Sequence, residues 1–171
     1  MDFQKVIDSR YSCRSYSNKE VEQEKIEKIL EAGRLAPTAK NTQCQRIYVL
    51  KDRQKINQIE SVKGMYNAPV VLIVCGDKES ECKRFFKDAS LMETDLSIIT
   101  TYMMLEATNQ GLQSCWVCYF NEAQTKKLFD IPENIEPYNL LLLGYPDENG
   151  VPSPRHYERK ELKDTIIWLD K

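Results

Sequence analysis

The run Pro69-Val70-Val71-Leu72-Ile73-Val74-Cys75 decides the fold class, because its apolar residues follow one another without a polar interruption. A run of this length and composition is typical of a β-strand that is buried on both faces. Further strands are expected at Ile47–Leu50, Ser114–Phe120 and Tyr138–Leu143, where β-branched and apolar residues cluster. Gly144-Tyr145-Pro146 stops the last of them.

Helices are expected between these strands. The longest, from about Phe86 to Gln110, carries apolar residues almost all the way round, is roughly 35 Å long, and ends at Gly111 as a C-cap. The other expected helices are a short one around Phe3–Ile7, then Val21–Leu35, Asp52 to about Val62, Glu122–Phe129, and Glu161–Asp170 with an apolar stripe of Leu162, Ile166 and Leu169. The sequence therefore predicts helices that alternate with strands along the chain.

The composition suits one compact domain. The chain has 171 residues, 42% of them apolar, which is enough for one core and leaves no room for a second domain. Its 24 Lys and Arg residues against 26 Asp and Glu give a net charge of -2, which provides no field for gathering nucleic acid or an anionic membrane. The chain start lacks a signal-peptide pattern and no stretch is apolar enough for a membrane span. We therefore expect a cytoplasmic protein with no membrane or nucleic-acid partner.

The reactive side chains exclude several classes of enzyme. A chain of this length needs no disulfide framework, and most of its six cysteines are expected as buried thiols in or beside apolar runs. His156 is the only histidine, which leaves no Ser-His-Asp triad and no histidine cluster for a metal. The glycines form neither a G-x-G-x-x-G turn nor a Walker loop, so a nucleotide has to be bound by another device.

The segment Arg10-Tyr11-Ser12-Cys13-Arg14-Ser15-Tyr16 is the first candidate site. In an extended chain Arg10, Ser12 and Arg14 project from one side, where two guanidinium groups and a hydroxyl can converge on one anion. Contacts of this kind contribute roughly 1.5 to 3 kcal/mol each, enough together for micromolar binding of a phosphate-bearing cofactor. On spacing alone, a solvated polar loop is the more common explanation of such a segment.

The segment Ala36-Pro37-Thr38-Ala39-Lys40-Asn41-Thr42-Gln43 is the second candidate. Pro37 ends the preceding helix, small residues let a flat ring approach the backbone, and Asn41 and Gln43 offer amide donors and acceptors. A turn rich in Thr and Asn is also ordinary between helices and strands, so this segment alone is a weak signal.

Together the two segments resemble the FMN-binding signature of the nitroreductase family. Gly111-Leu112-Gln113-Ser114-Cys115-Trp116-Val117, Leu143-Gly144-Tyr145-Pro146 and Arg159-Lys160 also stand where that family has equivalents, so the resemblance covers nearly the whole chain. It implies an α+β fold with a mixed, mainly antiparallel sheet flanked by helices, in an intertwined homodimer with FMN at the subunit interface. Residues 1–171 then form a single FMN-binding domain in which 147–171 are a C-terminal arm laid over the partner.

The resemblance also implies roles for the site residues. Arg10, Ser12 and Arg159 hold the FMN phosphate, and Arg14 reaches the pyrimidine side of the isoalloxazine, where a cation favours the reduced flavin. Pro37, Thr38 and Ala39 line the flavin from the other subunit, with Asn41 and Gln43 close behind. The backbone N–H groups near Cys118 and Tyr119 face its N5 atom. The expected cofactor-binding residues are Arg10, Tyr11, Ser12, Arg14, Pro37, Thr38, Ala39, Asn41, Gln43, Cys118, Tyr119 and Arg159. No side chain is expected to act as a catalytic acid or base.

The implied function is that of an FMN-dependent oxidoreductase. Hydride passes from NADH or NADPH through flavin N5 to a nitroaromatic, a quinone or a similar electron-poor acceptor, while the protein supplies position and charge. Three alternatives remain open: a flavin-binding sensor or carrier without catalysis, a dehalogenase or flavin-degrading relative on the same fold, and a redox module built on Cys115 and Cys118. The last is disfavoured because residues three apart on a strand point to opposite faces.

The chain departs from the family pattern in three places. Cys44-Gln45 stand where proline and an aromatic residue are usual, Gln113 replaces a glycine, and Cys118-Tyr119 replace small residues. These differences bear on the choice of acceptor more than on flavin binding. Cys13 lies between two arginines that can lower its pKa, which makes it a candidate oxidation-sensitive thiol.

Overall fold

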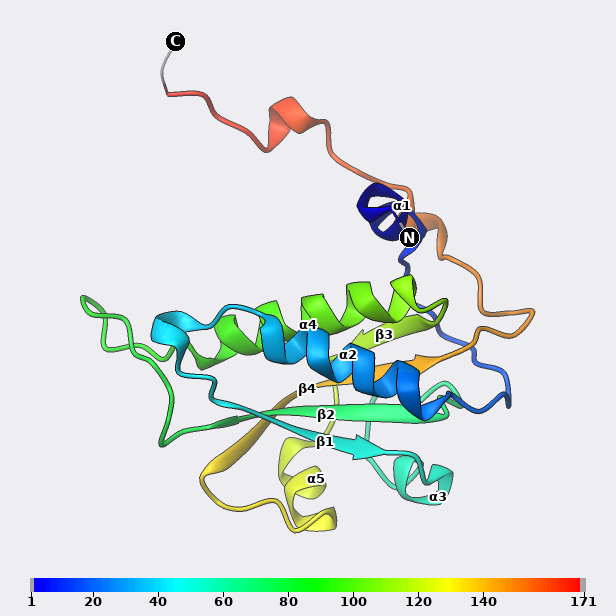
Figure 1. The fold of residues 1–171 in the computed structure, drawn as a ribbon, viewed down its shortest axis with the longest axis horizontal. Helices are drawn as coiled ribbons and strands as arrows, with labels where there is room; N and C mark the ends of the chain where they lie inside the picture. The colour runs from blue at the N-terminus through cyan, green and yellow to red at the C-terminus, as the bar shows by residue number, and fades with distance from the viewer. Residues whose placement is uncertain (1, 170–171) are drawn as a thin grey trace.

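The computed structural model describes residues 2–169, and its strands form one sheet in the order β1-β2-β4-β3 (Figure 1). Every pairing between neighbouring strands is antiparallel, and a parallel bridge joins Ser12 to Ser114 beside β3. The expected mainly antiparallel sheet is therefore confirmed. The strands are β1 (Gln45–Leu50), β2 (Val70–Asp77), β3 (Gln113–Val117) and β4 (Ile135–Gly144).

Helices cover both faces of this sheet (Figure 1). On one face lie α2 (Gln23–Leu35) and α4 (Met92–Asn109), and on the other lie α3 (Arg53–Ile56) and α5 (Glu122–Leu128). The shorter elements are α1 (Phe3–Ser9), which packs against α4, and the single 3-10 turns η1 (Ala39–Asn41), η2 (Pro154–His156) and η3 (Leu162–Asp164). Helices and sheet together make an α+β fold.

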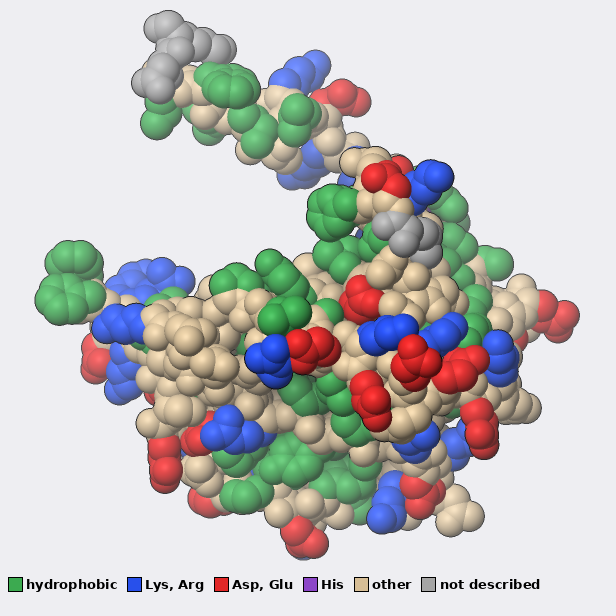
Figure 2. All heavy atoms as spheres, viewed as in Figure 1, with side chains coloured by type: hydrophobic (Ala, Val, Ile, Leu, Met, Phe, Trp, Pro, Cys, Tyr) green, Lys and Arg blue, Asp and Glu red, His purple; other side chains and the backbone are tan. Residues whose placement is uncertain are grey.

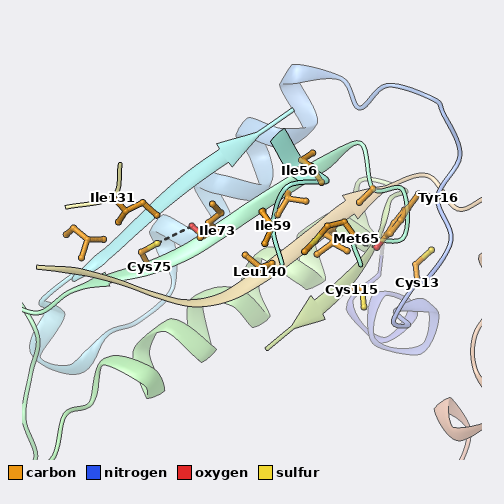
Figure 3. Packing of buried hydrophobic residues seen from close by; sticks show 14 residues of the cluster. Cys13, Tyr16, Ile56, Ile59, Met65, Ile73, Cys75, Cys115, Ile131 and Leu140 are labelled. Atoms are coloured by element: carbon orange, nitrogen blue, oxygen red, sulfur yellow. Dashed lines mark hydrogen bonds between the residues drawn. The ribbon is translucent and has the colours of Figure 1, made fainter. Parts of the chain in front are cut away.

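Strand β2 lies in the middle of the molecule, and all of its residues are buried. Alternate side chains enter two separate cores. Leu72 packs with Ile29 of α2 and Ile99 of α4, whereas Ile73 packs with Ile56 and Leu140 in the opposite cluster, shown in Figure 3. Because helices and loops cover both faces, even an antiparallel strand has no solvated side here, which explains the uninterrupted apolar run.

The central helix begins later than its sequence pattern predicts. The expected start at Phe86 is wrong, because α4 begins at Met92 and measures roughly 27 Å. Asp88 has a φ of 42°, which an α-helix does not accommodate, and the Ser90 hydroxyl accepts a hydrogen bond from the Met92 N–H at 3.0 Å. Gly111 follows the other end with a φ of 78°, as expected for a residue that stops a helix.

Two other expected helices are also shorter. Asp52 caps α3 as expected, accepting hydrogen bonds from the N–H groups of Gln54 and Lys55, but the helix stops at Ile56. The chain beyond it pairs instead with the segment after β3, where the Val62 N–H donates to the Tyr119 carbonyl at 3.1 Å. Tertiary pairing therefore replaces the helix expected up to Val62.

The helix expected over Glu161–Asp170 is wrong for the residues that the structure describes; Asp170 itself lies outside them. Only η3 forms there, and the side chains of Leu162 and Leu169 are 76% and 89% exposed. An apolar stripe gives a helix little stability when nothing packs against it. Within residues 2–169, no helix combines the length and hydrophobicity that crossing a bilayer requires.

Candidate functional site

The segment after α1 runs along the sheet edge in an extended conformation. Arg10 follows the helix with φ -71° and ψ 129°, and the Cys13 N–H donates to the Ser114 carbonyl of β3 at 2.9 Å. Cys13 is fully buried, while Arg10, Ser12 and Arg14 on alternate positions face a common hollow. The alternation expected from the sequence is present.

This hollow has a volume of about 720 Å³ and combines three parts of the chain. The segment 57–69 contributes Lys63 and Tyr66, and the C-terminal segment contributes Arg159. We call it the cation pocket; its lining residues are Arg10, Ser12, Arg14, Lys63, Tyr66, Ser153, Arg155, His156 and Arg159. Four of the expected site residues, Arg10, Ser12, Arg14 and Arg159, therefore lie together.

The cation pocket concentrates positive charge without compensation. Five of its lining residues are Arg or Lys and none is acidic. Over residues 2–169, none of these five cations forms an ion pair. Burial, together with the nearby charge of Arg159, lowers the pKa of Arg10. Like charges held this close favour binding of an anion.

A second hollow of about 450 Å³ adjoins the expected flavin-contacting residues Cys118 and Tyr119. Both side chains are exposed, Tyr119 to 80%. The facing wall is the segment Glu60–Val62, which is tied to it by the bond from the Val62 N–H to the Tyr119 carbonyl. Lys63 follows Val62 directly and lines the cation pocket, so adjacent residues of one segment line the two hollows.

The residues Pro37, Thr38, Ala39, Asn41 and Gln43 lie elsewhere. They follow the far end of α2, whereas residues 10–14 lie toward the opposite end of the molecule (Figure 1). The 13 residues of α2 alone span roughly 20 Å. One chain therefore does not bring this segment into the cation pocket.

Residues 37–43 have an unusual backbone. Lys40, Asn41 and Gln43 have φ values of 52°, 55° and 51°, a region that side-chain-bearing residues rarely adopt. The Thr38 hydroxyl accepts a hydrogen bond from the Gln43 N–H at 3.1 Å and closes the loop. Backbone strain of this kind concentrates at functional sites.

Several expectations about single residues need revision. Tyr11 does not line the cation pocket, because its hydroxyl donates to the Gly150 carbonyl. Burial raises the pKa of Cys13 and outweighs the lowering by Arg14, so the expected net lowering by the arginine neighbours is wrong. Cys118 is exposed, while the other five cysteines are buried free thiols. No cluster of metal-ligating side chains occurs in the described part of the chain.

Sequence reasoning missed five lining residues of the cation pocket: Lys63, Tyr66, Ser153, Arg155 and His156. They come from the segment 57–69 and from the C-terminal segment around η2, and their proximity depends on how these two segments fold back. The one local signal was the turn pattern around Lys63-Gly64, since Gly64 has a φ of 68°.

Residues 7–63 and 58–145 match the model of the family described as the nitroreductase family. A protein of Methanothermobacter thermautotrophicus with the provisional name NADH dehydrogenase/NAD(P)H nitroreductase is 32% identical over 157 residues, which are 87% of this chain and 80% of the relative. A nitroreductase family protein of Clostridium difficile 630 is 39% identical and superposes with a TM-score of 0.90 over 99% of both chains. An FMN-dependent nitroreductase of Clostridium difficile R20291 is 25% identical, with a TM-score of 0.79 over 97% of this chain and 98% of that one.

Proposed function

The chain belongs to the nitroreductase family, and we propose that it is an NAD(P)H-dependent oxidoreductase that uses FMN to reduce nitroaromatics, quinones or similar electron-poor acceptors. The observation that carries this proposal is the cation pocket, where five positive side chains surround a hollow without a carboxylate. A phosphate dianion supplies the missing counter-charge, and FMN ends in such a group.

The donor set of the cation pocket fits a phosphate. Arg10 and Arg159 offer guanidinium forks, and Ser12 offers a hydroxyl at their side. Burial, and after it the charge of Arg159, lowers the pKa of Arg10, and a bound dianion relieves the repulsion between the two arginines. We therefore assign the phosphate to Arg10, Ser12 and Arg159.

The flavin ring is proposed to lie between the two hollows. Arg14 and Lys63 then face its pyrimidine edge, and the backbone near Cys118 and Tyr119 faces N5. Bound FMN supplies the hydride-carrying chemistry, so the chain needs no acid or base of its own. Its cations at the pyrimidine edge stabilise the negative charge of the reduced cofactor.

The site is proposed to be completed by a second copy of the chain, which brings Pro37–Gln43 to the ring. Two unpartnered apolar surfaces support a homodimer. One is a groove of about 400 Å³ that includes Phe3 of α1 and Tyr102 of α4. The other is the segment projecting from the body in Figure 2, where Ile167 and Trp168 are 85% and 74% exposed. We propose one domain, 1–171, whose residues 147–171 are an arm that covers the partner.

The proposal is tested by purifying the protein, recording its absorption spectrum and identifying any released cofactor by mass. Flavin bands, the mass of FMN, and rapid anaerobic bleaching by NADH or NADPH are expected. Turnover with a nitroaromatic and a quinone then measures the acceptor range. A folded protein that binds no added FMN would refute the proposal. Bound FMN that bleaches only with dithionite would refute the enzymatic activity and indicate a flavin carrier.

A further inference from the structure

Helix α4 holds the strained loop after α2 through one buried carboxylate. Asp95 is 2% exposed, and its Oδ1 accepts a hydrogen bond from the Ala39 backbone N–H at 2.9 Å. Beyond the loop, the Asp77 N–H donates to the Cys44 carbonyl at 2.8 Å. The stretch with positive φ values therefore lies between two anchors, and only the first uses a charged side chain.

The bond from Ala39 acts where the backbone is least favourable. Lys40 and Asn41 follow at once with φ values of 52° and 55°, and neither residue is a glycine. Within the loop, the Thr42 N–H donates to the Ala39 carbonyl at 3.2 Å. Ala39 is thus fixed through its N–H by Asp95 and through its carbonyl by Thr42, and such conformations persist only where the surroundings impose them.

Burying the Asp95 carboxylate costs free energy, because the group loses its contact with water. Its second oxygen, Oδ2, is buried and has no hydrogen-bond partner among the described residues. The charge also contributes to the raised pKa of the Cys44 thiol, after burial. A charged acceptor makes a shorter and stronger bond to an N–H group than a neutral one, which gives the loop a firm anchor.

We propose that Asp95 is a positioning residue for the cofactor: by holding the Ala39 N–H it keeps residues 40–43 in the conformation that presents Asn41 to the flavin of the partner subunit. Asp95 itself touches no cofactor. This inference rests on the proposed function, since it assumes that residues 37–43 line the flavin.

The test compares FMN dissociation constants, measured by quenching of flavin fluorescence, for the full-length protein and three variants. Asp95→Ala is expected to bind FMN about 10-fold or more weakly, because the loop loses its anchor. Asp95→Asn keeps an acceptor oxygen and is expected to restore affinity to within about 3-fold of the original chain. Thr100→Val is the matched control, because Thr100 is a fully buried polar residue of the same helix whose hydroxyl bonds to the Leu96 carbonyl and to Asn139, outside the loop 37–43.

Amide hydrogen exchange supplies a readout that does not depend on the cofactor. The Ala39 amide is expected to exchange faster in Asp95→Ala than in Thr100→Val, even where the two variants unfold at similar temperatures. If Asp95→Ala does not fold, Ala39→Pro removes the donor from the other side of the same bond and should weaken FMN binding in the same way.

The outcomes separate the two proposals. An original chain that binds no FMN overturns the proposed function and this inference with it. An original chain that binds FMN, together with a folded Asp95→Ala or Ala39→Pro variant of unchanged affinity, overturns only the positioning role. Equal losses in Asp95→Ala and Thr100→Val would also overturn it, because the loss would then reflect helix stability alone.

Discussion

The cation pocket and the loop 37–43 are the two parts of the proposed flavin site, and they are built on opposite principles. The pocket gathers charged side chains from three parts of the chain. The loop carries few charges but fixes three residues in left-handed backbone conformations and anchors them to a buried carboxylate. In the proposed dimer, one chain supplies the positive charge at each flavin site, and its partner supplies the loop 37–43.

The largest effect on FMN affinity is expected from a change in the cation pocket. Arg10→Ala removes a charge-assisted contact worth roughly 1.5 to 3 kcal/mol, so FMN affinity should fall about 10-fold to 100-fold. Fluorescence titration measures it. The matched control is Arg34→Ala, which removes the same charge from an exposed arginine of α2 that pairs with Glu31 at 2.6 Å. Equal losses in both variants would show that net charge, rather than the pocket, governs binding.

A second effect is expected from the exposed C-terminal segment, which is proposed to join the two subunits. Ile167 is 85% exposed in the single chain and lines no part of the cation pocket. Burying an isoleucine contributes roughly 1.5 to 3 kcal/mol, so Ile167→Asp should weaken the dimer about 10-fold or more. Sedimentation velocity measures the dimer, and FMN affinity should become dependent on protein concentration. Lys163→Ser, a polar change on the same exposed segment, should leave both unchanged.

Two buried thiols report on the two regions through their pH dependence. Burial raises the pKa of Cys13, beside the cation pocket, and of Cys44, beside the loop, above 9.0. The unfolded chain loses these protons first, so the free energy of unfolding is undiminished below about pH 9 and falls as the pH rises through the raised values. Urea unfolding at pH 8, 9 and 10 measures the decline. Cys13→Ala and Cys44→Ala should each make it shallower, and an unchanged slope in either would contradict the burial of that thiol.

The smallest effect concerns strain in the loop. Lys40→Gly relieves a φ of 52° and should raise stability by roughly 0.5 to 1 kcal/mol. Glycine also leaves the loop less restricted to this conformation before FMN binds, so FMN affinity should fall about 2-fold to 3-fold. Asp130→Gly, with a φ of 50° just beyond α5, is the control, since it relieves similar strain away from the site. Thermal unfolding and FMN titration on both variants measure the two effects. A Lys40→Gly variant that binds FMN as well as Asp130→Gly would show that the strain has no part in binding.

The sequence predicted the cation pocket better than the conformation of the loop 37–43. Arg10, Ser12 and Arg14 alternate along an extended segment, and alternation is a local property that the letters display. Lys63 and Arg155 enter the same pocket only because two loops fold back toward it. The left-handed values at Lys40 and Gln43 have no compositional signal, since neither is glycine.

The fold shows the same division between local and tertiary causes. The apolar run of β2 predicted a strand buried on both faces, because a strand with one solvated face would alternate apolar and polar residues. The expected helix over Glu161–Asp170 failed in its described part, because its stripe depends on a surface that one chain does not provide. The late start of α4 follows from a turn that pairs Lys83 with Ser90 and contains Asp88, whose φ of 42° no periodicity reveals.

The most direct test of a site divided between two chains is complementation. Arg10→Ala damages only the cation pocket and Asn41→Ala only the loop, so each homodimer carries two damaged sites. Refolded together, the variants form mixed dimers in which one site receives both intact halves, and FMN binding should recover to about a quarter of the original number of sites. Tight FMN sites counted in the mixture at about this level are the predicted result. A mixture that binds no more FMN than the two variants measured separately would contradict a shared site.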